Sequence, residues 1–354
     1  MKYGRHQIDK AGDIIMLAKD SNEYNKALKI INEWRTLHLT ALDALQKEVV
    51  PLLTNHEIAI LLTSNRLKRI TSILYKLDIN PEMHLGGMQD IGGLRIVINN
   101  VEDLKSCQQI LTNKVPKSFD LVKIMDYVQK PKESGYRSIH FIYKYRSDNK
   151  DVDGAKVEMQ IRTKLQHSWA MAVETAGLIT NTQLKSSMGS EEWLNFFKIV
   201  SSLFAIKEKQ PILKAHIEKG YDMYDLMKLL YIANIEHNHS NTLKALRVTG
   251  IHAKRENFKN GYYILNINFQ SKIVKITAFS KEQENEASVA YSELEKGIID
   301  KNNAIVLVSV PKMKELQQAY PSYFLNTNEF LLAIDIMMAN YKKINIRHAC
   351  KENK

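Results

Sequence analysis

The chain has 354 residues, of which 44% are hydrophobic and 25% are charged, so it can bury a core and is not intrinsically disordered. Fifty Lys and Arg against 39 Asp and Glu give a net charge of +11, which favours a polyanionic partner such as a nucleic acid, a nucleotide or an anionic membrane surface. Two cysteines exclude a disulfide framework, and no apolar run reaches the length of a membrane span. We therefore expect a cytoplasmic protein that does not enter a membrane.

The first half of the chain predicts helices followed by a mixed sheet. Apolar residues recur at three- and four-residue steps through the first fifty residues, which is typical of amphipathic helices. A second helix is expected over about 56–77, and further helices over 101–113 and 164–176. Strands are expected at 94–98, 119–128, 138–145 and 155–162. Helix, strand, helix and three further strands indicate an α/β or α+β unit around one sheet.

The second half changes its order of elements. A Ser/Thr/Asn-rich stretch at 179–190 and a break at 236–241 flank the helices expected at 191–208 and 211–235. Beyond them we expect strands at 261–269, 272–280 and 304–310, a helix at 282–299 and helices to about 342. We interpret 1–245 as a first domain with its core at about 50–180, and 246–354 as a small second α+β domain.

A basic ridge is expected on the helix predicted at 56–77. Lys68, Ser72 and Lys76 lie at steps of four, and Arg66 stands one turn earlier. On an isolated helix such a ridge is most often a solvated face. It could also cradle a phosphate, because serine adds a small donor between two ammonium groups.

Asp90 precedes two glycines and a strand that contains Arg95. A glycine pair at the entrance of a strand usually marks only a turn. A carboxylate at the mouth of a sheet is also a place where a metal–phosphate complex can be held.

The loop Lys-Pro-Lys-Glu-Ser-Gly-Tyr at 130–136 joins two predicted strands. Glycine and proline are expected there for backbone reasons. An aromatic residue at a loop tip has nothing to pack on unless a ligand supplies it. Tyr136 could therefore stack on a base, while Lys132, Arg137 and His140 surround the attached phosphate or ribose.

Apolar and polar residues alternate strictly in the segment 156–163, where Glu158, Gln160 and Arg162 share one face. An exposed sheet face would explain the alternation. A polar row with apolar neighbours more often lines a cleft.

Together, in this order, the four stretches closely resemble the synthetase domain of the RelA/SpoT family over about residues 50–180. The motifs are Arg-x-Lys-x-x-x-Ser-x-x-x-Lys, Asp-x-x-Gly-x-Arg, Pro-Lys-x-x-Gly-Tyr-Arg-Ser-x-His and Glu-x-Gln-x-Arg-Thr. The resemblance implies a nucleotidyltransferase-like α+β fold, with a mixed β-sheet flanked by helices. It also implies an enzyme that uses Mg²⁺ and moves pyrophosphate from ATP to the 3′-hydroxyl of a ribose.

The same resemblance implies a role for each motif residue. Arg66 and Arg95 would sandwich adenine, and the ATP phosphates would contact Lys68, Ser72 and Lys76. Asp90 and Glu158 would bind Mg²⁺, and Glu158 would activate the 3′-hydroxyl. Tyr136 would stack on the acceptor base, in a site lined by Lys132, Arg137, His140, Gln160 and Arg162.

The acceptor stays open between two classes. A small alarmone synthetase would make (p)ppGpp from ATP and GDP or GTP, whereas a toxic relative would pyrophosphorylate the 3′ end of tRNA and block translation. The charge of +11 favours the second. A third alternative is a catalytically silent RNA- or protein-binding module, against which the retained carboxylates and cations argue. The chain has no His-Asp dipeptide, which argues against a hydrolase of this family.

Two features resemble the fused toxin–antitoxin branch known as CapRel. The amino-terminal helix carries Trp34, expected in the core, and Arg35 and His38, which could contact either RNA or the fold. Tyr320 and Tyr323 lie on a proline-containing turn, where tyrosines most often pack. By the resemblance they would dock into the ATP site, so that residues 246–354 act as an antitoxin in cis. A phage protein that binds this domain would release the enzyme, which we expect to be a monomer. The RNA-contacting cations suggested by charge and position are Arg5, Lys10, Arg35 and Lys130.

Overall fold

The computed structural model describes residues 1–17, 22–180, 189–244, 250–253, 261–268, 271, 273–296, 303–310, 315–316 and 327–352. The elements up to residue 180 are α1 (Arg5–Leu17), α2 (Asn22–Thr54), β1 (Ile60–Leu67), α3 (Ile70–Asp78), the 3-10 turn η1 (Leu85–Gly87), β2 (Gly92–Ile98), α4 (Val101–Asn113), β3 (Phe119–Asp126), β4 (Ile139–Tyr145), β5 (Lys156–Thr163) and α5 (Lys164–Thr180). The later elements are α6 (Glu191–Lys207), α7 (Lys214–Glu218), α8 (Met223–His237), α9 (His239–Lys244), β6 (Gly250–Ala253), β7 (Tyr262–Asn268), β8 (Ile273–Phe279), η3 (Lys281–Gln283), α10 (Glu284–Lys296), β9 (Asn303–Ser309) and α12 (Asn328–Glu352).

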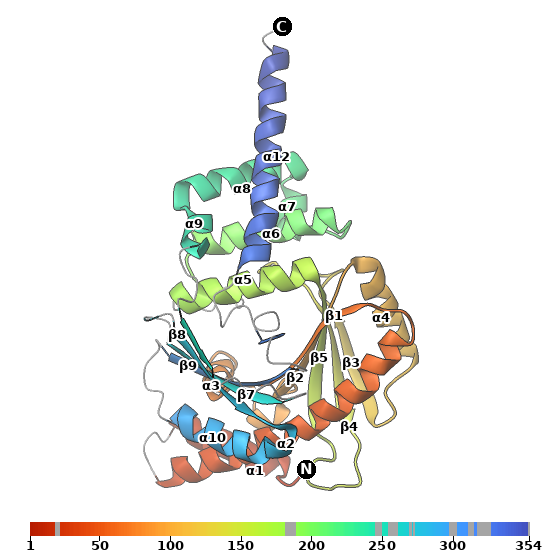
Figure 1. Ribbon diagram of the computed structural model, residues 1–354, viewed down its shortest axis with the longest axis vertical. Coiled ribbons are helices and arrows are strands. Elements are labelled where there is room, and N and C mark those ends of the chain that lie inside the picture. Colours follow the sequence, from red (N-terminus) through yellow and green to blue (C-terminus); the bar gives the residue numbers. More distant parts are fainter. Residues whose placement is uncertain are drawn as a thin grey trace.

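The strands form one mixed sheet in the order β3-β4-β5-β2-β1-β9-β7-β8-β6. The pairs β2–β5 and β6–β8 are parallel, and the other pairs are antiparallel. In Figure 1 the curved sheet lies between α1, α2 and α10 at the bottom and α5 above it. The predicted α+β class, with a mixed sheet flanked by helices and a carboxy-terminal region of strands and helices, is confirmed.

The helix predicted over 56–77 is wrong. Residues 60–67 form β1, and only the last part of the segment, from Ile70, is helical. The helical period came from Ile73 and Leu77, which are buried on α3, whereas β1 is buried on both faces and lies between β2 and β9. Lys68 therefore lies in the link between strand and helix and does not form a helical ridge with Ser72 and Lys76.

The helix predicted over 211–235 is two helices, α7 and α8. A capping box between Asp222 and Asp225 begins the second, because each side chain accepts a hydrogen bond from the other residue's backbone N–H. The short strand β6 was not predicted.

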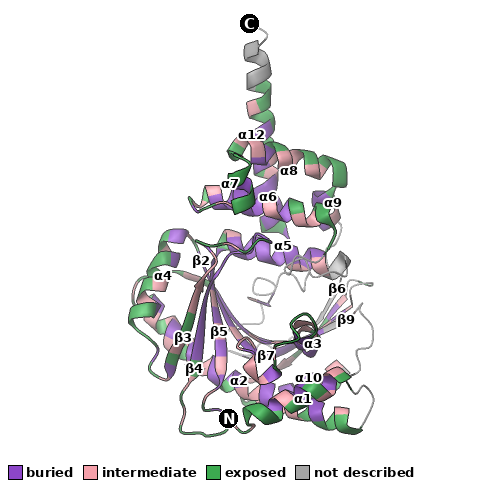
Figure 2. Cartoon of the chain, turned by 180° about the vertical axis from the view of Figure 1, so that it is seen from behind, coloured by how far each residue is buried: buried purple, intermediate pink, exposed green. Residues whose placement is uncertain are grey.

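Two of the four hydrophobic clusters among the described residues lie on either side of α5. Beneath the sheet, Leu42 of α2, Ile96 of β2 and Met159 of β5 are fully buried in one cluster. Above α5, Phe197 of α6 and Phe330 of α12 pack in a second cluster. Figure 2 shows buried residues concentrated on the strands and on the inner sides of these helices. The opposite face of the sheet carries a further apolar cluster that includes Leu62, Val97 and Val306, and it is polar where β1, β2 and β5 meet.

The strands on either side of the predicted boundary at 245/246 belong to one sheet, because β9 pairs with β1 at Asn65 and Arg66. The long helix α12 then packs on α5, α8 and α9, and its end projects beyond them (Figure 1). The boundary itself stays a prediction. Tyr320 and Tyr323 lie outside the described residues.

The amino-terminal helix α2 contacts the fold through all three residues singled out in the sequence. Trp34 is buried, and its ring meets that of His38 edge to face at 5.0 Å. Burial lowers the pKa of His38 to about 4. Arg35 is only 1% exposed, so it is not available to RNA, and its suggested RNA contact is wrong.

No cluster of three metal-binding side chains occurs within the described ranges. His239 is buried against Trp193, with ring centroids 4.2 Å apart, and so belongs to the helical core. In the part of the chain that the structure describes, no helix has the length and apolar character needed to cross a bilayer.

Candidate active site

A small pocket opens on the sheet face opposite α2, where β1, β2 and β5 are neighbours. Strand register places its side chains in two rows. Arg66, Gly93 and Glu158 form one row, and Ser64, Arg95 and Gln160 form the next. Since side chains alternate between the faces of a strand, one short segment of each strand supplies two positions to the pocket.

The alternation predicted for residues 156–163 is confirmed. Val157 and Met159 are fully buried in the core under the sheet. Glu158 and Gln160 point to the opposite face and line the pocket. The polar row thus faces a cleft.

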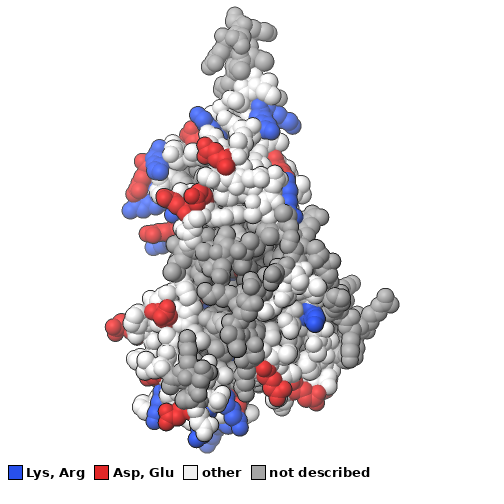
Figure 3. Space-filling model, turned by 90° about the vertical axis from the view of Figure 1, so that its left-hand side faces the viewer, with Lys and Arg blue, Asp and Glu red and all other residues white. Residues whose placement is uncertain are grey.

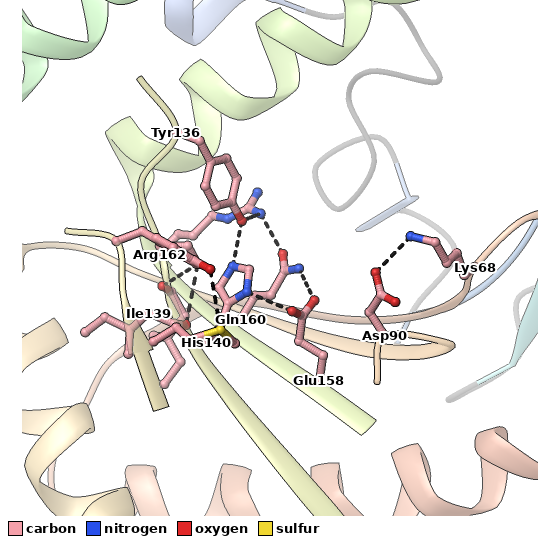
Figure 4. A network of polar contacts seen from close by, with 12 residues as sticks. Lys68, Asp90, Tyr136, Ile139, His140, Glu158, Gln160 and Arg162 are labelled. Atoms are coloured by element: carbon pink, nitrogen blue, oxygen red, sulfur yellow. Dashed lines mark hydrogen bonds and ion pairs between the residues drawn. The ribbon is translucent and has the colours of Figure 1, made fainter. Parts of the chain in front are cut away.

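Asp90 lies at the edge of the pocket between two lysines. Its Oδ2 is 2.8 Å from Lys68 Nζ, and its Oδ1 is 3.0 Å from Lys76 Nζ. Burial alone would raise the pKa of Asp90, but the two ammonium groups hold it well below its ordinary value. In Figure 4 the Asp90 carboxylate points toward Lys68, and Glu158 lies on the other side of Asp90. Ser72 is half-buried on α3, one turn before Lys76.

Glu158 begins a chain of polar contacts that leads away from Asp90 (Figure 4). Its Oε1 is 2.7 Å from His140 Nδ1, and the other imidazole nitrogen of His140 is 2.8 Å from the Tyr136 hydroxyl. Arg162 donates to the same hydroxyl and to the Gln160 side-chain oxygen, at 2.6 Å in the second case. The Gln160 amide donates back to Glu158, which closes the network.

The contacts within this network shift the pKa values of His140, Tyr136 and Glu158. Burial alone would lower the pKa of His140, but Tyr136 and the hydrogen bond to Glu158 raise it to about 9. Burial would likewise raise the pKa of Tyr136, yet Arg162 and His140 lower it to about 7. Burial would raise the pKa of Glu158 too, but His140 brings it below its ordinary value. The hydrogen bond between them thus favours the ionised form of Glu158 and the protonated form of His140.

Tyr136 does not stand at an exposed loop tip. It is 7% exposed and packs edge to face on Tyr127, with ring centroids 6.1 Å apart. The exposed Lys132 places its ammonium group 5.4 Å from the Tyr136 ring centroid. The ring thus has protein partners, and its hydroxyl faces the network.

Arg137 is directed to α6 and not into the pocket. Its Nε donates to Ser201 Oγ at 3.1 Å, and its Nη1 donates to the Val128 carbonyl at the same distance. Ser201 Oγ also donates to the Gly135 carbonyl at 2.6 Å. Gly135 has a φ of 92°, and a Cβ there would lie 2.8 Å from that of Ser201. The glycine is therefore required so that the loop can approach α6.

The two arginines expected to clasp adenine both line the pocket and reach toward α5. Arg66 Nη1 is 4.0 Å from Glu174 Oε1, and Arg95 Nη1 is 3.9 Å from the Met171 sulfur. Sequence reasoning missed Glu174 and Met171, which α5 brings over the pocket. It also missed Ser64, which the alternation of β1 with Arg66 would have revealed had the strand been recognised.

The donor set of the pocket fits Mg²⁺. Asp90 and Glu158 offer hard carboxylate oxygens, and Mg²⁺ is commonly bound by one or two carboxylates together with water and substrate phosphates. The charge of Asp90 also raises the pKa of Glu158, which shows that the two carboxylates repel each other. A divalent cation between them would relieve this repulsion.

Comparison with known families identifies this part of the chain. Residues 65–178 match the family described as "Region found in RelA / SpoT proteins". This segment is a RelA/SpoT-family domain. Every predicted site residue from Arg66 to Arg162 falls within the RelA/SpoT domain, whereas α10 and β9 lie outside it.

Relatives of the RelA/SpoT domain include two proteins of Bacillus subtilis. The chain is 38% identical over 112 residues to the GTP pyrophosphokinase YjbM, an alignment that covers 30% of this chain and 51% of that protein. It is 33% identical over 114 residues to the GTP pyrophosphokinase YwaC, covering 30% and 53%. The chain thus spans about half the length of these relatives. The crystal structure of small alarmone synthetase 1 from Bacillus subtilis bound to its product pppGpp aligns with a TM-score of 0.42 and 26% identity, over 48% of this chain and 88% of that one.

Proposed function

We propose that the RelA/SpoT domain transfers pyrophosphate from ATP to the 3′-hydroxyl of a ribose. The observation that supports this most directly is the convergence of Asp90, held between two lysines, and ionised Glu158 on one pocket. Pyrophosphoryl transfer needs in-line placement and charge neutralisation more than covalent help from the protein. The pocket offers both cations and carboxylates for that purpose.

In this proposal the protein holds the donor with residues of β1, β2, α3 and the link between β1 and α3. Lys68, Ser72 and Lys76 bind the triphosphate, while the guanidinium planes of Arg66 and Arg95 lie against adenine. Mg²⁺, when held by the carboxylates of Asp90 and Glu158, would neutralise phosphate charge.

The transfer itself balances as follows. The acceptor hydroxyl oxygen forms a bond to the β-phosphorus, the bond from that phosphorus to the α–β bridging oxygen breaks, and AMP leaves. Glu158 takes the hydroxyl proton. His140 donates to Glu158 and keeps it ionised and oriented before the transfer.

GDP or GTP is the acceptor that the relatives favour, since both are named GTP pyrophosphokinases. The acceptor would enter beside Glu158, where Gln160, Arg162 and His140 supply polar groups. Lys132 stands exposed near the same loop. The Tyr136 hydroxyl bonds to His140 and Arg162, and its ring packs on Tyr127, so stacking of an acceptor base on this ring stays a proposal.

The 3′ end of tRNA is a second candidate, which the net charge of +11 favours. In that case residues 246–354 would inhibit the toxin through Tyr320 and Tyr323, and a phage protein would release it. Such a trigger must prefer the released state by several kcal/mol. On the face shown in Figure 3, the coloured Lys and Arg side chains are interspersed with Asp and Glu over the helical part and do not gather into one patch there.

One labelling experiment separates these proposals. The protein is incubated with γ-labelled ATP, Mg²⁺ and either GDP, GTP or bulk tRNA, and Glu158→Gln serves as the inactive control. Label on the guanosine nucleotide supports the first acceptor, and label on tRNA supports the second. If ATP binds but neither acceptor is labelled, the transfer proposal fails and a catalytically silent binding module takes its place.

A further inference from the structure

The helix that carries Ser72 and Lys76 is capped by a residue far away in the sequence. The N-cap residue of α3 is Arg69, whose guanidinium group only donates hydrogen bonds and cannot accept one from a backbone N–H. The first helical N–H, that of Ile70, donates instead to Glu295 Oε1 at 3.0 Å. Glu295 lies on α10, 225 positions later. A carboxylate at this end of a helix satisfies an orphan donor and complements the helix dipole.

Glu295 is itself held firmly. Its Oε2 lies 3.0 Å from Nη1 of Arg35, and the two side chains are 9% and 2% exposed. Tyr291, one turn earlier on α10, donates to Glu295 Oε1 at 2.8 Å and accepts from Arg35 Nη2 at 2.9 Å. Asn32 accepts from Arg35 Nη1 at 2.7 Å. The carboxylate therefore has a fixed place between α2 and α3.

We infer that Glu295 is a positioning residue of the nucleotide site, which sets the start of α3 and thereby the two lysines that flank Asp90. Lys68 lies two residues before Ile70, and Lys76 lies on the same short helix. A nine-residue helix is too short to be stable alone and depends on its tertiary contacts. The inference rests on the proposed function only where it names the triphosphate as the ligand of these lysines.

The same region reaches the site at a second point, because β9 pairs with β1 at Arg66. Residues beyond the RelA/SpoT domain thus support both the strand that carries Arg66 and the helix that carries Lys76. The region after residue 246 therefore contributes to the frame of the site, whatever inhibitory role it has in addition.

Three variants of the full chain test this inference. Glu295→Ala removes both the cap and the partner of Arg35. Glu295→Gln removes the charge but keeps a carbonyl oxygen for the Ile70 N–H. Tyr291→Phe is the matched control, because it removes the hydroxyl that bonds to Arg35 and Glu295 but keeps the carboxylate that accepts from the Ile70 N–H. Hydrogen exchange of the peptide covering 67–78, equilibrium binding of a non-hydrolysable Mg-ATP analogue and the melting temperature are measured for each.

We expect Glu295→Ala to increase the hydrogen-exchange rate in α3 about tenfold and to lower the affinity for the analogue about tenfold. Each change corresponds to a loss of roughly 1.4 kcal/mol. Glu295→Gln and Tyr291→Phe should lower the melting temperature yet stay within about threefold of the parent in both other measurements. If exchange and affinity instead follow the melting temperature across all three variants, Glu295 has only a structural role and the inference is overturned. A parent protein that binds no analogue would refute the proposed function, and the exchange measurement would still decide the role of Glu295.

Discussion

Two adjacent glycines at the start of β2 face opposite sides of the sheet, and replacing each with alanine should separate stability from nucleotide binding. A Cβ at Gly92 would lie 3.1 Å from His38 Cβ and 3.1 Å from Leu42 Cδ1 of α2. A Cβ at Gly93 would lie 3.9 Å from the Arg66 carbonyl oxygen, an ordinary contact distance. Both residues lie in extended backbone that alanine can adopt.

The two substitutions therefore differ in the side of the sheet that they fill. Gly92→Ala overpacks the contact with α2 and should lower the free energy of unfolding by about 1–3 kcal/mol. Gly93→Ala should be neutral or stabilise by up to about 1 kcal/mol, since glycine is unfavourable in a strand. Its methyl group enters the pocket row between Arg66 and Glu158, so the affinity for Mg-ATP should fall by about tenfold or more.

Urea unfolding and equilibrium ATP binding measure the two effects in the same preparations. Unchanged m-values would confirm that the midpoints report stability alone. The reasoning is refuted if Gly93→Ala binds ATP like the parent, or if it loses as much stability as Gly92→Ala. The first result would mean that ATP does not bind against Gly93, and the second would mean that the pocket does not accommodate the added methyl group.

Three further predictions concern charged residues of the site. Glu158→Gln should abolish turnover, because the proton acceptor is lost. Its affinity for ATP should stay within about threefold of the parent, because the triphosphate contacts remain. Product formation and ATP binding are measured for both proteins. Arg137→Ala should lower the free energy of unfolding by about 2–4 kcal/mol through its lost bonds to α6, whereas Lys132→Ala should leave it within about 0.5 kcal/mol and raise only the KM for the acceptor. The two lysines depress the pKa of Asp90, so its carboxylate contributes stability above pH 3.8 that is lost as the pH falls further. In Asp90→Asn, the free energy of unfolding should therefore depend less on pH in this acid range. An unchanged pH dependence would contradict the ion pairs with the lysines.

The sequence alone predicted those parts of the fold and the site that depend on the local pattern of apolar and polar residues. Alternation in β5 correctly separated Glu158 and Gln160 from the buried Val157 and Met159, because a half-buried strand shows its two faces in its residue types. The bounds of α4 were also predicted, and Asn100 explains why, since its side chain accepts from the Asp103 N–H and caps the helix.

The local residue pattern gave wrong predictions where contacts between residues far apart in the sequence determine the structure. The apolar spacing of α3 was extended backwards over β1, although β1 becomes a strand through its pairing with β2 and β9. Tyr136 was read as an exposed loop residue, whereas Tyr127 and His140, brought close by β4 and the turn after β3, give it partners. Arg35 had no visible partner because Glu295 is 260 positions away. A single sequence shows none of these long-range contacts.

The buried pair of Arg35 and Glu295 also decides how autoinhibition can be tested. Deleting the chain from residue 246 would remove all of α10, and with it Glu295 and Tyr291, which both bond to the Arg35 guanidinium group. It would also remove β9 and expose the edge of β1 beside Arg66. A silent truncated protein would therefore say nothing against inhibition, because its nucleotide site would have lost its frame. Replacing Tyr320 and Tyr323 with alanine in the full chain keeps Glu295 and β9 in place, so toxicity of that variant is the outcome that bears on inhibition, and its absence counts against it.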